Sequence, residues 1–207
     1  MIERDVIEYI KKIKAHAQTG LTYSTDPYDI QRYQELSQIS DELTQLISDQ
    51  PIQRINDFYI NAKEYPTPKV DVRAVVFDDE GRLLLVKEKA DGCWALPGGW
   101  ADIGISPAEN AVKEVQEETG YHVKPTRLLG ILDKRNHAHP PCLEYTYKIF
   151  IQCEITGGRS TKSFDILEVG FFAQSDIPPL SLERNTSHQL GLMFEFFNNS
   201  MKPALFE

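Results

Sequence analysis

The hydrophobic residues of this chain follow one period in its first third and another in the rest. Up to about residue 65, apolar side chains recur every three or four positions, which predicts helices with one buried face. Gly20 is placed to end the first helix, because glycine adopts the left-handed C-cap conformation without strain. The apolar face of that helix comprises Ile2, Val6, Tyr9, Ile10 and Ile13.

A second helix is predicted from Pro27 to about residue 47, with Asp26 as its N-cap and proline at its first position. A short third helix is expected at about 51–62. Pro66 and Pro68 follow it in the sequence "YPTP", which is typical of a linker. We therefore expect an all-α domain at 1–65 and a second domain at 66–207.

Beyond Lys69 the period changes to that of β-strands. The segment 69–89 predicts a hairpin-like pair of strands around Asp79–Gly81, and Gly157–Gly158 predicts a turn between later strands. Further strands are expected near 127–135, 142–155 and 168–174, and helices at about 107–119 and 184–199. Strands interrupted by helices in this way indicate an α/β (α+β) fold, with a mixed sheet and helices on both faces.

The composition is that of an ordinary globular protein, with 41% hydrophobic and 26% charged residues. No run of eighteen apolar residues is present, so we expect no membrane segment. Cys93, Cys142 and Cys153 form no CxxC pair, which favours reduced thiols and a cytoplasmic location. The formal net charge of -9 disfavours broad binding to a nucleic-acid backbone.

Three carboxylates at helical spacing, Glu114, Glu117 and Glu118, lie in the predicted helix at 107–119. Like charges at this spacing destabilise a helix. The row taken alone also fits a solvated acidic face, and the flanking sequence favours a site. Ser106 and Glu109 form a capping box, and Gly120 stands where a left-handed C-cap belongs. Carboxylates held on a helix with two defined ends suit the hard cations Mg2+ or Mn2+.

The segment "GWADIGISPAENAVKEVQEETGY", Gly99 to Tyr121, resembles the Nudix box, G-x5-E-x7-R-E-U-x-E-E-x-G-U, where U is a bulky apolar residue. The preceding "WALPGG" is also typical of that family, and the resemblance covers roughly residues 69–180. Two positions depart from the box: Ile105 replaces its first glutamate and Lys113 its arginine. A lysine can still contact Glu117 at i, i+4 but lacks the planar fork of arginine.

The resemblance implies an α/β/α sandwich and the Mg2+- or Mn2+-dependent hydrolysis of a nucleoside diphosphate linked to another moiety. It implies that the three glutamates bind the metal through their side chains and Gly99 through its carbonyl group. Glu118 is then expected to hold or deprotonate the attacking water. Family members use a further glutamate outside the box, for which Glu168 is the first candidate and Glu144 the second.

Substrate-binding candidates are basic or polar residues outside the box. Lys134, Arg135 and His137 lie in the polar loop 133–141, where His137 and His139 would share one side of a strand, and Arg73 lies on the first predicted strand. Lysine and arginine there can meet phosphate. Glu144 is the remaining substrate-binding candidate.

The N-terminal helices resemble the extension of a Bacillus-type Nudix subgroup that includes ADP-ribose and CDP-choline pyrophosphatases. The box variant is most similar to the group that cleaves CDP-choline to CMP and phosphocholine, so CDP-choline is the first expected substrate and ADP-ribose the next. The extension is expected to serve dimerisation, giving a homodimer, or to act as a lid. Tyr23, Tyr28 and Tyr33 could form an aromatic cage for choline or an apolar stripe. An RNA-processing hydrolase and a non-catalytic nucleotide-sensing module are the alternatives.

Overall fold

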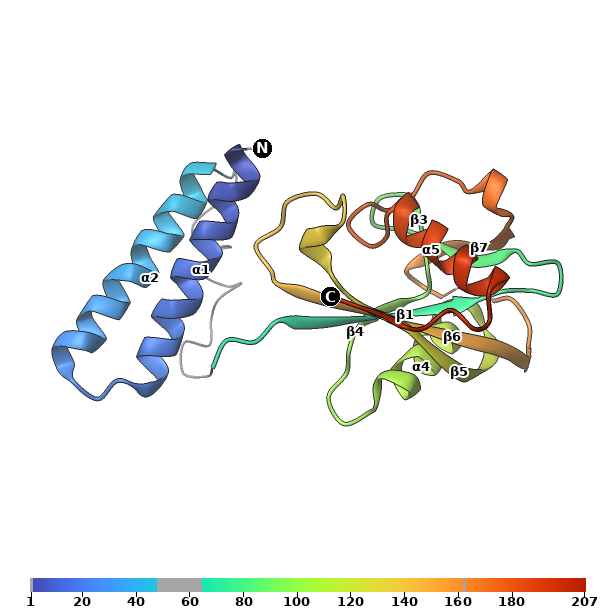
Figure 1. Ribbon diagram of the computed structural model, residues 1–207, viewed down its shortest axis with the longest axis horizontal. Coiled ribbons are helices and arrows are strands. Elements are labelled where there is room, and N and C mark those ends of the chain that lie inside the picture. Colours follow the sequence, from blue (N-terminus) through green and yellow to red (C-terminus); the bar gives the residue numbers. More distant parts are fainter. Residues whose placement is uncertain (1, 48–64, 162) are drawn as a thin grey trace. The chain divides into compact units, whose positions relative to one another are not determined.

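The computed structural model describes residues 2–47, 65–161 and 163–207. Contacts divide the chain into two units (Figure 1). The first comprises Met1–Pro68 with Pro141–Tyr145, and the second comprises Lys69–Pro140 with Thr146–Glu207. The helix expected at 51–62 lies outside the described residues. None of the helices in the described part of the chain is long and apolar enough to cross a membrane.

The N-terminal unit contains the helices α1 (Ile2–Tyr23) and α2 (Pro27–Ile47), which lie side by side (Figure 1). Asp26 caps α2 as predicted, because its Oδ1 atom accepts hydrogen bonds from the backbone N–H groups of Tyr28 and Asp29 at 2.9 and 3.1 Å. Between the helices, the Lys14 ammonium group lies 2.6 Å from the carboxylate of Asp41, and both residues are buried. This ion pair fixes the register of the two helices.

The prediction that Gly20 ends the first helix is wrong. Helix α1 continues to Tyr23, and the N–H group of Ser24 still donates to the Gly20 carbonyl at 2.8 Å. A Cβ atom at position 20 would lie 2.4 Å from the ring of Tyr33 on α2. The glycine therefore permits close packing of the helices, which a local sequence signal cannot distinguish from a cap.

The second unit contains two sheets. In the five-stranded sheet the strands follow the order β4-β1-β6-β5-β8. The pairs β1–β6 and β5–β8 are parallel, and the pairs β4–β1 and β6–β5 are antiparallel. This mixed sheet confirms the predicted fold class. Its strands are β1 (Lys69–Val76), β4 (Gly98–Trp100), β5 (Tyr121–Asp133), β6 (Thr146–Gly158) and β8 (Leu205–Phe206). The antiparallel second sheet, in the order β3-β2-β7, contains β2 (Leu83–Glu88), β3 (Trp94–Ala95) and β7 (Ile166–Phe172).

Two local predictions within this unit are wrong. The strands β1 and β2 meet at a turn closed by hydrogen bonds between Asp78 and Arg82 and between Gly81 and Asp78, but they then enter different sheets. Both strands are buried on both faces over most of their length, so each lies between two other layers instead of pairing as an exposed hairpin. Gly157–Gly158 forms no turn and continues β6, opposite Tyr121 and His122 of β5.

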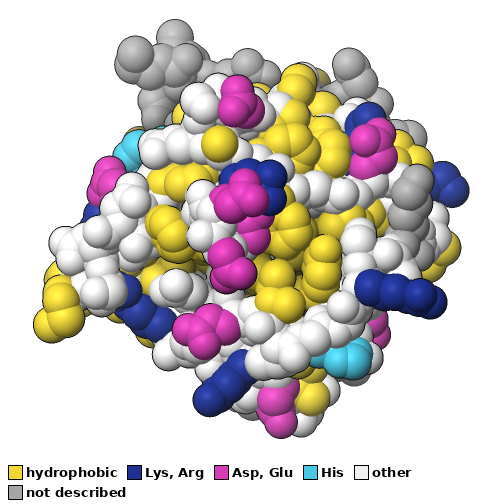
Figure 2. All heavy atoms as spheres, turned by 90° about the vertical axis from the view of Figure 1, so that its right-hand side faces the viewer, with side chains coloured by type: hydrophobic (Ala, Val, Ile, Leu, Met, Phe, Trp, Pro, Cys, Tyr) yellow, Lys and Arg dark blue, Asp and Glu magenta, His cyan; other side chains and the backbone are white. Residues whose placement is uncertain are grey.

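The helices α4 (Pro107–Thr119) and α5 (Ser187–Asn198) form two separate cores with the strands. On one side Ala111 and Val115 of α4 pack with Val72 and Ala74 of β1. On the other side, Val75 of β1 joins the core that contains the α5 residues Leu190, Met193, Phe194 and Phe196. Because successive residues of a strand face opposite ways, the two helices cover opposite faces, as predicted. Figure 2 shows that hydrophobic side chains also gather in the middle of one face of this unit, between scattered charged groups.

Candidate active site

Helix α4 is held at both ends by the caps that the sequence predicts. The Ser106 Oγ atom accepts from the N–H group of Glu109 at 3.2 Å, and the Glu109 carboxylate accepts from the N–H group of Ser106 at 2.7 Å. Gly120 adopts a left-handed conformation, with φ at 75° and its N–H group bonded to the Gln116 carbonyl. The capped helix presents its acidic residues at fixed positions on its surface.

Two of the three box carboxylates lie against strand β4. Glu118 is 9% exposed, and its Oε2 atom accepts a hydrogen bond from the N–H group of Gly98 at 3.0 Å. Glu114 lies beside Gly99, where an added Cβ atom would be 3.3 Å from its Oε1 atom. Burial raises the pKa of Glu118 to about 8 and also raises the pKa of Glu114, because charged carboxylates are poorly solvated there.

The third box carboxylate, Glu117, turns toward solvent. Its side chain is 57% exposed and lies 3.1 Å from the Lys113 ammonium group, the i, i+4 contact predicted for the box lysine. Lys113 also donates to Asp102 at 2.9 Å. Ile105, at the position of the missing box glutamate, lies in the loop before the helix and is 37% exposed. The basic residue of the box thus pairs with two exposed carboxylates.

The residues at β4 fit a divalent cation. Among the described residues, no three His, Cys, Asp or Glu side chains lie close enough to form a complete metal site by themselves. Mg2+, however, is commonly bound by one or two carboxylates together with water and substrate phosphates. The half-buried Glu114 and the buried Glu118 have raised pKa values that a nearby cation would reverse, and the Gly99 backbone leaves space beside Glu114.

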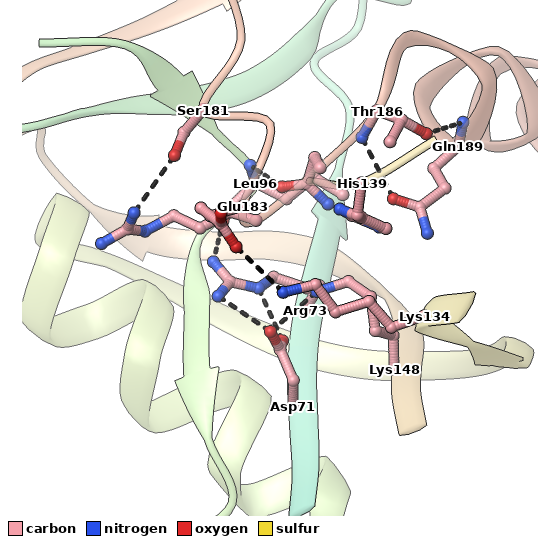
Figure 3. A network of polar contacts seen from close by, with 12 residues as sticks. Asp71, Arg73, Leu96, Lys134, His139, Lys148, Ser181, Glu183, Thr186 and Gln189 are labelled. Atoms are coloured by element: carbon pink, nitrogen blue, oxygen red, sulfur yellow. Dashed lines mark hydrogen bonds and ion pairs between the residues drawn. The ribbon is translucent and has the colours of Figure 1, made fainter. Parts of the chain in front are cut away.

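Arg73, predicted to bind phosphate, is instead buried behind these carboxylates, at 4% exposure. Its guanidinium group donates to both oxygens of Asp71 and, through Nη1, to the Leu96 carbonyl at 3.0 Å. The Lys148 ammonium group also donates to Asp71, at 2.7 Å, so that the carboxylate lies between two cations (Figure 3). Burial would raise the pKa of Asp71, but the two cations outweigh it and lower that pKa to about 2. For Lys148 burial dominates and lowers the pKa to about 8.

The structure adds Glu88 and Arg184, which the sequence analysis missed. Glu88 ends β2, is 7% exposed and lies 2.7 Å from the Nε atom of Arg184. Burial raises the pKa of Glu88, and its charge in turn raises that of Glu118. A carboxylate at the end of a strand that begins with four apolar residues was the available sequence signal.

The remaining candidates are engaged in ion pairs or lie elsewhere. Glu168, on β7, pairs with Lys87 at 2.7 Å and its side chain is 53% exposed. Glu144 belongs to the segment Pro141–Tyr145, which is grouped with the N-terminal helices, and its carbonyl accepts from the Lys11 ammonium group at 3.0 Å.

Basic residues of the loop 133–141 face carboxylates. Lys134 lies 3.1 Å from Glu183, and Arg135 lies 2.6 Å from Asp133. His137 and His139 follow the short 3-10 helix Lys134–Asn136 and lie in a loop, as predicted, so their rings do not share one side of a strand. Both are buried, His137 beside Glu207 at 3.4 Å and His139 bonded to the Leu182 carbonyl at 2.6 Å, and burial lowers the pKa of each imidazole.

Comparison with protein families finds two matches in this chain. Residues 4–59 match a family described as a UDP-X-like, N-terminal oligomerisation domain, and residues 67–190 match the NUDIX domain. A relative from Bacillus subtilis, YjhB, provisionally named an ADP-ribose pyrophosphatase, is 45% identical over 97% of this chain and 96% of its own. An ADP-ribose pyrophosphatase from Methanocaldococcus jannaschii is 31% identical over 58% of this chain and 70% of its own.

Two solved structures resemble the chain at more than 30% identity. A UDP-X diphosphatase covers 99% of both chains at 31% identity, with a TM-score of 0.64. An ADP-ribose pyrophosphatase from Streptococcus suis is 40% identical, covering 68% of this chain and 100% of its own, with a TM-score of 0.62.

Proposed function

Because this chain belongs to the Nudix hydrolases, we propose that it cleaves the pyrophosphate bond of a nucleoside diphosphate joined to a second moiety, with Mg2+ or Mn2+ as cofactor. The observation that carries the proposal is the pair of carboxylates formed by the half-buried Glu114 and the buried Glu118, held against Gly98 and Gly99 by a helix capped at both ends. Water attacks one phosphorus atom, and the bond from that phosphorus to the bridging oxygen breaks. The products are a nucleoside monophosphate and the phosphorylated second moiety.

Each residue near β4 has a part in this reaction. Glu114, Glu118 and the Gly99 carbonyl would hold the cation, and Glu117 would join them once its side chain leaves Lys113. A cation held there would supply positive charge to the diphosphate and to the attacking water. Glu118 accepts the proton of that water, a role supported by its burial beside the Gly98 N–H group.

Several residues are assigned to the substrate phosphates and to water. Arg184, held at Glu88, joins Lys134, Arg135 and His137 as a basic candidate for the phosphates, whereas the buried Arg73 is left out of this set. Lys134 and Arg135 would exchange Glu183 and Asp133 for phosphate oxygens, since both now contact carboxylates. Glu168 and Glu144 remain candidates for a further glutamate that positions water.

We rank ADP-ribose first among the substrates, ahead of UDP-linked compounds and CDP-choline. The support is the name of the full-length relative and of the Streptococcus suis structure, followed by that of the UDP-X diphosphatase. The ring of Tyr33 packs onto Gly20, which favours the apolar-stripe role for it over a choline cage.

The N-terminal unit, at residues 1–65, is proposed to form a homodimer, with a lid for the catalytic domain at 66–207 as the alternative. The support is the oligomerisation family matched by residues 4–59 and the exposed apolar side chains of α1 and α2, among which Tyr9, Tyr28 and Leu46 are 65%, 72% and 81% exposed. A cytoplasmic location is in keeping with the three free cysteines, Cys93, Cys142 and Cys153.

Product analysis tests the proposal. The protein is incubated with ADP-ribose, UDP-glucose, CDP-choline and a short RNA, each with Mg2+, with Mn2+ and with a chelator. We expect release of a nucleoside monophosphate only with a cation, and its loss in the Glu118→Gln variant. Cleavage of RNA alone would support the RNA-processing alternative, and nucleotide binding without turnover of any substrate would support a sensing module.

A further inference from the structure

The segment Leu96–Gly98, between β3 and β4, is held by buried side chains from two sides. The Leu96 carbonyl accepts from Nη1 of Arg73 at 3.0 Å, and its N–H group donates to Oδ1 of Asn185 at 2.9 Å. Leu96 and Asn185 are both fully buried, and Arg73 nearly so. The backbone of this segment is therefore anchored by the first strand on one side and by the loop before α5 on the other.

This anchoring decides where the N–H group of Gly98 points. Gly98 lies opposite Arg73 in the pairing of β4 with β1, and its φ of 141° is in a region that other residues rarely adopt. A Cβ atom here would lie 2.1 Å from the Val72 carbonyl oxygen and 2.9 Å from the Cα atom of Arg73. In this conformation the Gly98 N–H group donates to the Oε2 atom of Glu118 at 3.0 Å.

Arg73 can anchor Leu96 because it is itself fixed. Its Nε and Nη2 atoms donate to the two oxygens of Asp71 at 2.7 and 3.2 Å, which leaves Nη1 for the Leu96 carbonyl. Lys148 holds Asp71 from the other side (Figure 3). A planar guanidinium group can make these bonds at once, whereas a lysine ammonium group in its place lacks the fork geometry.

The basic residue of the box is occupied elsewhere. The hydrogen bond and ion pair that the structure shows for Lys113 go to Asp102 and Glu117, both more than half exposed. Arg73, by contrast, lies opposite Gly98 in the sheet and donates to the Leu96 carbonyl. The basic side chain that contacts the backbone before β4 therefore comes from β1, outside the box.

From these contacts we infer that Arg73 and Asn185 are positioning residues that hold the Leu96–Gly98 segment, so that the Gly98 N–H group fixes the carboxylate of Glu118. Arg73 acts through this segment and contacts no phosphate. The inference rests on the proposed function for the role of Glu118, but the hydrogen bond that it concerns can be measured without turnover.

The test follows the amide signal of Gly98 by NMR in the metal-free protein, together with the kinetics of ADP-ribose hydrolysis. In the Arg73→Lys variant we expect the Gly98 signal to move toward its position in a Glu118→Ala variant, where the bond is absent. We expect kcat to fall about 10- to 100-fold with KM within about twofold, because a small displacement of a reacting group has effects of this size. The matched control is Arg82→Lys, since Arg82 also pairs with an aspartate, Asp78, but lies at the β1–β2 turn, and it should change neither readout.

Other outcomes would overturn the inference. An unchanged Gly98 signal in a folded Arg73→Lys protein would refute it, and so would a rise in KM at constant kcat, which would indicate a phosphate contact. If that variant does not fold, the Asn185→Leu variant provides the test, because it removes the acceptor for the Leu96 N–H group. It must move the Gly98 signal and lower kcat. No change in either quantity would refute the inference. A wild-type protein that hydrolyses no nucleotide, yet shows the Gly98 signal responding as expected, would refute the proposed function alone.

Discussion

Asp71 is shared by two buried cations, and this arrangement predicts an asymmetry in the stability of its variants. The side chains of Asp71, Arg73 and Lys148 are 9%, 5% and 0% exposed. Replacing Asp71 by asparagine would leave two buried cations without their counter-charge. Replacing Lys148 by methionine would leave the two-point contact between Arg73 and Asp71 in place.

The pKa values indicate the sizes of these effects. The pKa of Asp71 is lowered from 3.8 to about 2, which corresponds to roughly 2 kcal/mol of stability at about 1.4 kcal/mol per pKa unit. Loss of one partner from a buried ion pair costs about 3–5 kcal/mol, so we expect Asp71→Asn to fall in that range. The pKa of Lys148 is lowered from 10.5 to about 8, so its buried charge opposes folding at neutral pH. Lys148→Met should therefore cost less than about 1 kcal/mol or stabilise the protein.

Urea denaturation followed by tryptophan fluorescence is a suitable assay. The two tryptophans of the chain, Trp94 and Trp100, both lie in the second unit, which also contains Asp71. Asp71→Asn should lower the free energy of unfolding at pH 7 far more than Lys148→Met does. The cost of Asp71→Asn should shrink as the pH falls from about 4 to about 2, because the carboxylate stabilises the fold only while it is ionised. Equal costs for the two variants, or a larger cost for Lys148→Met, would refute this account of the network.

Three further predictions concern the site. Gly98→Ala should destabilise the protein by more than about 2 kcal/mol in thermal denaturation. The new Cβ atom would meet the Val72 carbonyl oxygen, and residue 98 has a φ of 141° that alanine rarely adopts. An unchanged Tm would contradict this geometry. Glu118→Gln should lower kcat by about 100-fold or more in a steady-state assay. The same variant should raise the Tm of the chelator-treated protein at pH 8. Burial raises the pKa of Glu118, so its charge costs stability increasingly from about pH 4.5 to 8. Lys113→Ala should change the free energy of unfolding in urea by less than about 0.5 kcal/mol, because the partners of Lys113, Asp102 and Glu117, are largely exposed. A cost above about 2 kcal/mol would show that the box lysine supports the fold.

Local features of the site were predictable because their determinants are contiguous. Ser106, Glu109 and Gly120 lie within three residues of the ends of α4, and the hydrogen bonds that cap this helix involve only its own residues and neighbours. The spacing of Glu114 and Glu118 likewise placed both on one helical face, where the structure brings them to β4.

The errors occurred where a local signal had two physical meanings. Gly20 satisfied the pattern of a helix C-cap, but a close approach between two helices requires the same residue. The segment 69–89 satisfied the pattern of a hairpin, but the burial of both faces sent its strands into different sheets. Neither burial nor the identity of the packing partner is contained in a short stretch of residues.

The sequence by itself determined the chemistry of this protein: a capped acidic helix, the glycines before it and a family of hydrolases in which both serve catalysis. Only the tertiary structure decided which side chains hold the backbone segment beside that helix. Arg73 and Asn185 lie 23 and 89 positions from Leu96 along the chain, and the pairing of distant strands and loops brings them to it. The charge of a buried carboxylate depends on these neighbours, because solvent no longer screens it, and their positions are set by the packing of the whole unit.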